Sequence, residues 1–265
     1  MTPDEQAVPA EASDIVFVDG SWSILIAEDN PGCRARLEAA LADYSYPTEV
    51  RIVARGEDLL RELATNAYDL AFVDIALGTS SGLDAVRAAR EQGMGTFVVV
   101  VSGSRTALDR SEARALGAYD FIGKPVSTLD VHRALDAFQK VRARSTALLI
   151  DDSGTARRLM KRIFDRSIFR VDVVEAADGV EGIELFARAP TDFVFIDLHM
   201  GGLDGLATAR IIRAVNPDTK IVIVSAALSG LAEDSRFATL KKPFYARQLD
   251  AMLHDLKGLP HPALM

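Results

Sequence analysis

Short apolar runs rich in valine and isoleucine alternate with longer amphipathic stretches along most of the chain. Such runs are typical of parallel strands buried on both faces, and the stretches between them have helical spacing. The pattern therefore predicts an α/β fold in which helices cover both faces of a parallel sheet. The predicted strands are 23–28, 49–54, 69–74, 97–102, 119–123, 146–151, 170–175, 192–197, 220–225 and 238–241. The predicted helices are 31–43, 56–66, 83–92, 105–116, 128–142, 154–166, 179–188, 204–215 and 245–256.

The pattern occurs twice, and polar residues at the ends of the predicted strands mark the repeat. In each copy an acidic pair follows the first strand, an aspartate ends the third, a serine ends the fourth and Lys-Pro follows the fifth. These residues are Glu28, Asp29, Asp74, Ser102, Lys124 and Pro125 in the first copy, and Asp151, Asp152, Asp197, Ser225, Lys242 and Pro243 in the second. The spacing between the serine and the lysine is shorter in the second copy, which therefore lacks a few residues there.

The repeat predicts two domains, over residues 22–143 and 146–258. An acidic, disordered lead-in is expected over 1–21 and a short tail over 259–265, which leaves no room for an output domain. Each domain is predicted to be doubly wound around a five-stranded parallel sheet, in the flavodoxin-like arrangement. The residues missing from the second copy fall near 228–236, so its fourth helix is predicted to be shortened to one or two turns.

Composition limits the location and the partners of the protein. The chain has 265 residues, is 49% hydrophobic and carries a formal net charge of −8, which indicates a real core and argues against a wide basic surface for nucleic acid. Its apolar runs are strand-sized, and its first residues lack the basic start of a secretory signal. Cys33 is the only cysteine, so an intrachain disulfide is excluded. We expect a cytoplasmic protein that binds neither nucleic acid nor membranes.

The acidic residues at the strand ends are candidates for a metal site. Ligands of open parallel sheets bind at the carboxyl ends of the strands, and Glu28, Asp29 and Asp74 meet there if the first and third strands are neighbours. Mutual repulsion would raise the pKa of at least one carboxyl group unless a cation lies among them. A cluster that offers only oxygen ligands, with a lysine nearby, suits Mg²⁺.

In this order, the acidic pair, the lone aspartate, the serine and the Lys-Pro pair resemble those of the CheY-like receiver domain of response regulators, in both copies. The resemblance implies that Asp74 and Asp197 accept phosphoryl groups from a phosphohistidine on a histidine kinase or a histidine phosphotransfer protein. It also implies a Mg²⁺ site in each copy, which includes a backbone carbonyl two residues beyond the acceptor. The implied ligands are Glu28, Asp29, Asp74 and Ala76 (backbone), and Asp151, Asp152, Asp197 and His199 (backbone).

The same resemblance implies roles for the lysines and the serines. Lys124 and Lys242 would pair with phosphoryl oxygens, and the peptide bond between each lysine and its proline would be cis. Ser102 and Ser225 would donate a hydrogen bond to the phosphoryl group, and their movement would be the switch. The small residues that follow the serines leave room for that group.

Departures from the family pattern distinguish the two copies. Three residues before the lysine, where the family usually has an aromatic side chain, the copies have Phe121 and Thr239. We therefore expect the first copy to keep the usual output face, with a homodimer through this domain as an open alternative, and the second to have an altered one. Two residues beyond Asp74 and Asp197 the copies have Ala76 and His199. Since the family uses this position to tune the lifetime of the phosphoryl group, that lifetime should differ between the two copies. The His199 side chain is expected to point to solvent.

Simpler interpretations stand beside these. An acidic pair at a strand end is often a helix cap, and the glycines at 56, 82, 179 and 205 are explained as helix boundaries. The basic helix over 154–166 is either a solvated face or a docking surface for a partner helix; its cations are Arg157, Arg158, Lys161, Arg162 and Arg166. Cys33 is either a reactive thiol or neutral in function, and His132, His254 and His261 are taken as incidental.

The leading hypothesis is a response regulator of a two-component or phosphorelay pathway that signals through protein contacts or onward phosphotransfer. It is not an enzyme beyond slow self-catalysed phosphotransfer and autodephosphorylation. The alternatives are a phosphorylation-independent adaptor or scaffold and a phosphate sink for a histidine kinase. The sequence leaves open the kinase, the downstream protein target, the receiver that is phosphorylated, the direction of phosphate flow and the oligomeric state.

Overall fold

The computed structural model describes residues 20–103, 106–226 and 237–264. The chain divides into two compact units, one over residues 1–134 together with Leu264, and the other over residues 135–263. The division falls inside a helix, Thr128–Arg142 (α5). Each unit contains one five-stranded parallel sheet covered by helices, and the units are described separately.

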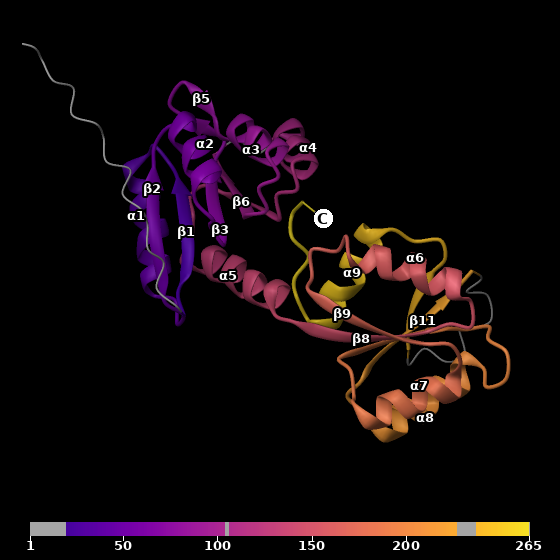
Figure 1. Ribbon diagram of the computed structural model, residues 1–265. Coiled ribbons are helices and arrows are strands. Elements are labelled where there is room, and N and C mark those ends of the chain that lie inside the picture. Colours follow the sequence, from indigo (N-terminus) through magenta and orange to yellow (C-terminus); the bar gives the residue numbers. More distant parts are fainter. Residues whose placement is uncertain (1–19, 104–105, 227–236, 265) are drawn as a thin grey trace, which may run out of the picture. The chain divides into compact units, whose positions relative to one another are not determined.

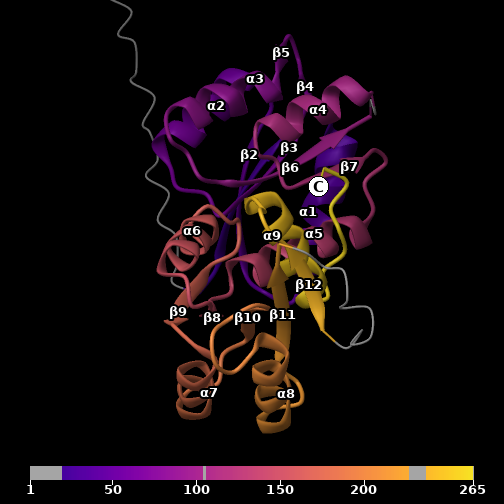
Figure 2. The same ribbon diagram turned by 90° about the vertical axis from the view of Figure 1, so that its right-hand side faces the viewer.

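The first unit has a sheet with the strand order β2-β1-β3-β6-β7. Figures 1 and 2 show α2, α3 and α4 on one face of this sheet and α1 and α5 on the other. The strands are Trp22–Ala27 (β1), Thr48–Val53 (β2), Leu70–Asp74 (β3), Phe97–Ser102 (β6) and Asp120–Gly123 (β7). The other helices are Pro31–Ala42 (α1), Gly56–Thr65 (α2), Gly82–Glu91 (α3) and Ala107–Ala115 (α4).

The second unit repeats this arrangement with the strand order β12-β11-β10-β8-β9. Figures 1 and 2 show α7 and α8 on one face of its sheet and α6 and α9 on the other. The strands are Ser145–Ile150 (β8), Val171–Ala176 (β9), Phe193–Asp197 (β10), Lys220–Ser225 (β11) and Ala238–Lys241 (β12). The helices are Gly154–Phe164 (α6), Gly179–Arg188 (α7), Gly205–Val215 (α8) and Ala246–Leu256 (α9).

The central strands of both sheets are apolar because both of their faces are covered. Every residue of β3 is buried, and β1 and β6 are buried after their first residue. The same holds for β10 up to its final aspartate, which is half-buried. A strand with no solvent-facing side cannot show alternating polar residues, which explains the continuous apolar runs of the sequence. The predicted α/β, doubly wound fold with two parallel sheets is confirmed.

One pair of strands was not predicted. Ala76–Leu77 (β4) and Ser80–Ser81 (β5) form a two-stranded antiparallel hairpin directly after β3. Its turn contains Gly78, whose φ of 62° lies in the left-handed region that glycine favours. The predicted shortened fourth helix of the second copy falls on residues 227–236 and therefore lies outside the described residues.

Candidate functional site

The sheet of the first unit brings its predicted site residues to one edge. β1 lies beside β3, and β6 and β7 follow in order, so residues at the carboxyl ends of these strands become neighbours. Glu28, Asp74 and Ser102 are buried there, with exposed fractions of 1%, 5% and 3%, whereas Asp29 is exposed. Burial of two carboxylates and a hydroxyl at a surface edge is unusual and requires polar partners inside the protein.

Lys124 provides a partner for both buried carboxylates. Its Nζ donates to Asp74 Oδ2 at 2.6 Å and to Glu28 Oε1 at 2.8 Å. The peptide bond between Lys124 and Pro125 is cis, as predicted. Burial by itself would lower the pKa of Lys124, but the hydrogen bonds and negative charges of Asp74 and Glu28 raise it above its ordinary value.

The pKa of Asp74 shows that the lysine does not fully compensate for burial. Desolvation raises this pKa above its ordinary value, and the hydrogen bond and charge of Lys124 offset only part of the effect. The negative charge of Glu28 acts in the same direction as burial. A further cation at this edge would therefore stabilise the ionised form of Asp74.

The second unit repeats the bridge. Lys242 Nζ donates to Asp151 Oδ2 at 2.6 Å and to Asp197 Oδ1 at 2.9 Å, and the bond between Lys242 and Pro243 is also cis. Burial alone would lower the pKa of Lys242, but the two aspartates raise it. Asp151 and Ser225 are buried, with exposed fractions of 1% and 0%, while the Asp197 side chain is 13% exposed.

Both units contain an acidic cluster that fits a divalent cation. One oxygen each from Glu28, Asp29 and Asp74 lies within 4.8 Å of the others, and the three aspartates of the second unit form an equivalent cluster. Glu28 Oε2 is buried and accepts no hydrogen bond, although Lys124 Nζ lies 2.7 Å away. A cluster that offers only oxygen ligands suits a hard cation such as Mg²⁺.

The loops after β3 and β10 contact the outer aspartates. The backbone nitrogen of Gly78 donates to Asp29 Oδ2 at 3.0 Å, and that of Gly201 donates to Asp152 Oδ2 at 3.1 Å. Ala76 is exposed, and its backbone nitrogen lies 3.3 Å from Asp74 Oδ1, to which it donates. His199 occupies the equivalent position in the second unit and is exposed, in agreement with the predicted direction of its side chain.

Two glycines owe their identity to the site. A Cβ atom on Gly82 would lie 2.0 Å from the carbonyl oxygen of Asp74, and one on Gly205 would lie 2.2 Å from that of Asp197. The sequence interpretation of these glycines as helix boundaries was therefore incomplete. Each glycine begins a helix that packs directly against the backbone of the aspartate at the end of β3 or β10.

The predicted difference between Phe121 and Thr239 is visible in the two edge strands. Phe121 is buried in β7, and the Arg110 guanidinium lies 5.5 Å from the centre of its ring. Thr239 on β12 is exposed. The two copies therefore differ at this position of the edge strand, where the first has a buried ring and the second an exposed small side chain.

Cys33 lies beside the first cluster but is not activated. Its thiol is buried at the start of α1, and desolvation together with Glu28 raises its pKa to about 12. A protonated thiol is a poor nucleophile, so the interpretation of Cys33 as a reactive thiol is not supported.

Arg157 is a site neighbour that the sequence analysis grouped with a basic helical face. Its Nη1 donates to the backbone carbonyl oxygen of Asp151 at 2.7 Å, and its Nε donates to Glu175 Oε2 at 3.2 Å. It thus joins α6 to the ends of β8 and β9. The other cations of this helix, Arg158, Lys161 and Arg162, are exposed.

His254 also differs from its interpretation as an incidental residue. It is fully buried, its Nδ1 lies 2.8 Å from the carbonyl oxygen of Asp250, and its ring packs at 5.0 Å against Phe169. Burial lowers its pKa below the ordinary value. These contacts place His254 in the packing between α9 and the segment that joins α6 to β9, so its part is structural.

The model of the response regulator receiver domain matches residues 24–136 and 147–254, which together make up most of the chain. The chain belongs to the response-regulator receiver family. The two units are accordingly two receivers in tandem, of a family whose members act in two-component systems, interact with histidine kinases or phosphotransfer proteins, and typically bind Mg²⁺ at the acidic cluster. Among the helices that the structure describes, none has the length and apolar character needed to cross a bilayer.

Named relatives share one receiver with this chain. The transcriptional regulatory protein DltR of Streptococcus agalactiae serotype III is 33% identical over 102 residues, which cover 38% of this chain and 45% of DltR. The regulatory protein TorR of Escherichia coli is 32% identical over 103 residues, which cover 39% of this chain and 44% of TorR. The match thus spans less than half of either relative.

A solved structure resembles the tandem arrangement as a fold. The crystal structure of a putative two-component system response regulator/GGDEF domain protein covers 90% of this chain and 99% of its own, with a TM-score of 0.60 and 23% sequence identity. At this identity the likeness concerns the fold. Response regulators are generally not true enzymes, which agrees with the expectation for this chain.

Proposed function

We propose that this chain is a phosphorylation-switched response regulator in which Asp74 and Asp197 each accept a phosphoryl group from a phosphohistidine. The observation that carries the proposal is the same in both receivers: a lysine on a cis Lys-Pro bond donates to the acceptor aspartate and to a buried acidic neighbour. As is typical of response regulators, the protein would act in the cytoplasm.

The transfer joins an aspartate oxygen to phosphorus and breaks the bond between phosphorus and the histidine nitrogen. The nitrogen keeps the electron pair of that bond, and the imidazole leaves as a neutral ring because a proton is already on its other nitrogen in the protonated phosphohistidine. Asp74 and Asp197 must be ionised to act as nucleophiles. In the first receiver Lys124 favours that form by donating to Asp74, and Lys242 donates to Asp197 in the second.

The acidic clusters would hold Mg²⁺ through Glu28, Asp29 and Asp74 in the first receiver, and through Asp151, Asp152 and Asp197 in the second. The backbone carbonyls of Ala76 and His199 would complete these ligand sets. When bound, Mg²⁺ reduces the repulsion between an anionic nucleophile and an anionic phosphoryl group.

Ser102 and Ser225 would convert phosphorylation into a change of shape. Both are buried at the ends of the strands that lie next to the acceptor strands. A hydroxyl that turns toward the phosphoryl oxygens alters the packing behind it, and in the first receiver Phe121 lies on the neighbouring strand. The first receiver would therefore carry the usual output face, where a downstream protein or a second copy binds.

Labelling with acetyl phosphate tests this function without a kinase. In the presence of Mg²⁺ the full chain should gain up to two phosphates in its intact mass. Asp74→Asn and Asp197→Asn should each remove one, and the double variant should gain none. Asp218→Asn, at an exposed position, serves as the matched control. Unchanged labelling in the double variant would show that other residues accept the phosphate and contradicts the proposal. No labelling in the wild type also contradicts it and favours a phosphorylation-independent scaffold.

A further inference from the structure

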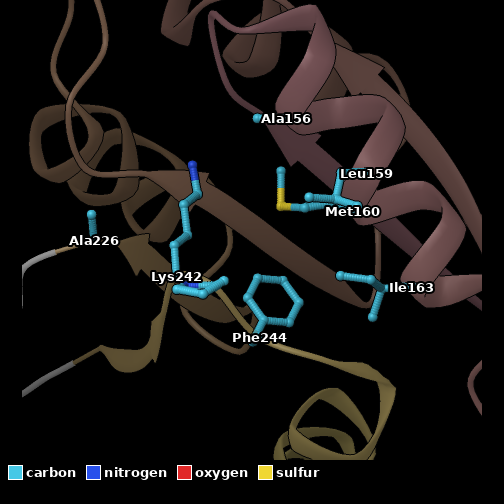
Figure 3. A pocket seen from close by; sticks show the side chains of 8 residues that line it. Ala156, Leu159, Met160, Ile163, Ala226, Lys242 and Phe244 are labelled. Atoms are coloured by element: carbon cyan, nitrogen blue, oxygen red, sulfur yellow. The ribbon is translucent and has the colours of Figure 1, made fainter.

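An apolar groove lies beside the site lysine of the second receiver. Figure 3 shows Lys242 on one side of its space and Ile163 of α6 on the other, and the groove has a volume of about 320 Å³. Leu159 and Phe244 also line it. Because Lys242 donates to Asp197, this groove belongs to the site already described. A second cavity of the same receiver has a different, more polar lining.

The second cavity lies along α9 and is called the α9 cavity. Its volume of about 670 Å³ falls in the range of pockets that hold small organic ligands. One wall is the start of α9, and the other is the segment that follows this helix. The cavity is lined by Tyr245, Arg247, Gln248, Ala251, His261 and Pro262.

The segment after α9 is held against the helix. Gly258 takes a φ of 61°, in the left-handed region, and the backbone nitrogen of Leu259 donates to the carbonyl oxygen of His254 at 2.9 Å. The His261 ring stacks on His254 with centroids 5.9 Å apart, and its Nε2 lies 2.8 Å from Asp255 Oδ1. These contacts fix the second wall of the α9 cavity.

The polar side chains at the start of α9 offer hydrogen-bond donors. Arg247 is exposed, and among the residues that the structure describes it has no acidic group within ion-pair distance. Gln248 Oε1 accepts from the backbone nitrogen of Tyr245 at 2.8 Å, so its amide nitrogen, which only donates, is the group left for an occupant. Donors around one positive charge suit an anion with several acceptor oxygens, such as a phosphate group.

Tyr245 adds an aromatic surface to the cavity. Its side chain is 71% exposed, although an aromatic ring gains free energy by leaving water. The other wall contributes the His261 ring and Pro262. A planar ring stacked on Tyr245 would cover this surface. An occupant that matches both features therefore joins a planar ring to an anionic group.

The first receiver has different side chains at the matching positions of the repeat. The tyrosine, the arginine and the glutamine are replaced there by Ser127, Leu129 and Asp130. Ser127 Oγ donates to Asp130 Oδ2 at 2.6 Å, and the carboxylate of Asp130 would repel an anion. The aromatic surface and the cation of the α9 cavity are therefore properties of the second receiver.

We propose that the α9 cavity binds a nucleoside phosphate, with the base stacked on Tyr245 and the phosphate held by Arg247. The inference goes beyond the proposed function, because it assigns a small ligand to the second receiver in addition to its phosphoryl group. Tyr245 comes three residues after Lys242, so the ligand would contact the segment that directly follows the site lysine.

Calorimetric titration of the full chain with AMP, adenosine and inorganic phosphate tests the proposal. EDTA in the buffer prevents AMP from binding through a divalent cation at the acidic clusters. We expect AMP to bind about tenfold more tightly than adenosine or phosphate, because AMP alone of the three offers both a ring and an anion. GMP should bind about as tightly as AMP, since stacking tolerates different bases.

Substitutions on α9 and directly before it locate the binding. Arg247→Gln and Tyr245→Ala should each weaken AMP binding about tenfold, whereas Tyr245→Phe keeps the ring and should bind AMP as the wild type does. Both positions are exposed, so we expect these variants to fold. Arg133→Gln, at an exposed position of α5 in the first receiver, is the matched control and should leave binding unchanged.

Several results overturn the inference. One is the absence of AMP and GMP binding, and another is binding that resists both Arg247→Gln and Tyr245→Ala. Equal affinities for AMP and inorganic phosphate would identify a plain anion site, and equal affinities for AMP and adenosine a site for an uncharged ring. Labelling of Asp197 by acetyl phosphate does not depend on these results, so the proposed function is tested separately.

Discussion

The two receivers have the same polar residues at their strand ends, but the helices beside these sites carry different side chains. In each, one lysine bridges the acceptor and a buried acid, at distances between 2.6 and 2.9 Å. The helix that follows the acidic pair differs: α1 carries Ala35 and Ala39 where α6 carries Arg158 and Arg162, and Arg36 stands where α6 has Leu159. The chemistry of the site restricts which residue types can stand at the strand ends, whereas the residue types on the adjoining helix surface are less restricted. The comparison teaches that the residues at the strand ends are repeated in both receivers, whereas the exposed residues of the adjoining helix are not.

The strongest test of the shared chemistry is the glycine that touches each acceptor backbone. Gly82→Ala and Gly205→Ala should each destabilise their own receiver by about 4 kcal/mol, because the new Cβ would lie within 2.2 Å of a carbonyl oxygen. Urea unfolding measures both, and fluorescence of the single tryptophan, Trp22, reports on the first receiver. Gly95→Ala is the control, since nothing lies within 4 Å of its added Cβ. An effect as small as that of the control would show that the close approach is tolerated.

The edge strands should respond unequally to truncation. Phe121→Ala should destabilise the first receiver by about 3 kcal/mol, because the buried ring leaves a cavity and loses its contact with Arg110. Thr239→Ala, at an exposed position, should change the free energy of unfolding by less than about 0.5 kcal/mol. Urea denaturation of both variants checks this difference. Equal effects would remove the structural distinction between the two output faces.

Arg157 tests how far the second site depends on its basic helix. Arg157→Gln removes donors to the Asp151 carbonyl and to Glu175, and should destabilise the second receiver by about 1 kcal/mol. It should also slow acetyl phosphate labelling of Asp197, because Asp151 is less firmly held. Arg34→Gln, the matching change on α1, is the control and should leave Asp197 labelling unaffected. Labelling that is unchanged in Arg157→Gln would limit this arginine to a stabilising role.

The smallest expected effect concerns the pKa of Asp74. Burial raises this pKa in the folded state, so ionised Asp74 opposes folding at neutral pH, and that penalty disappears as the pH falls below the unfolded value. Asp74→Asn should therefore stabilise the first receiver slightly at neutral pH, and the difference from wild type should shrink in acid. Trp22 fluorescence during urea unfolding at several pH values measures this. A difference that grows in acid would contradict the sign of the shift.

Much of the site could be predicted from sequence because its residues stand at strand ends in a repeated order. Parallel strands place their carboxyl ends at one edge, so Asp74 and Lys124 converge although fifty residues separate them along the chain. The β4–β5 hairpin was missed because strands of two residues have no detectable periodicity. The role of Arg157 was missed because its partner Glu175 lies on β9, and a basic helix looks the same in sequence whether its cations are paired or solvated.

The groove in the second receiver illustrates a further limit of sequence analysis. Leu159 and Ile163 occupy one face of α6, but Phe244 comes from a loop far along the chain. Apolar residues at helical spacing predict a buried face, and only the packing of α6 against its neighbours determines which of them remain open. The basic helix was left between two interpretations for the same reason.

The lysine bridge has a consequence for the capacity of each site. An ammonium group has three hydrogen atoms to donate, and in both receivers two of them are directed at carboxylates. Among the contacts of the described residues, Lys242 therefore keeps one donor position for a third oxygen, whereas Lys124 Nζ already lies 2.7 Å from a third oxygen, Glu28 Oε2. An arriving anion can thus bind Lys242 without the loss of either existing hydrogen bond, and at Lys124 it would compete with Glu28.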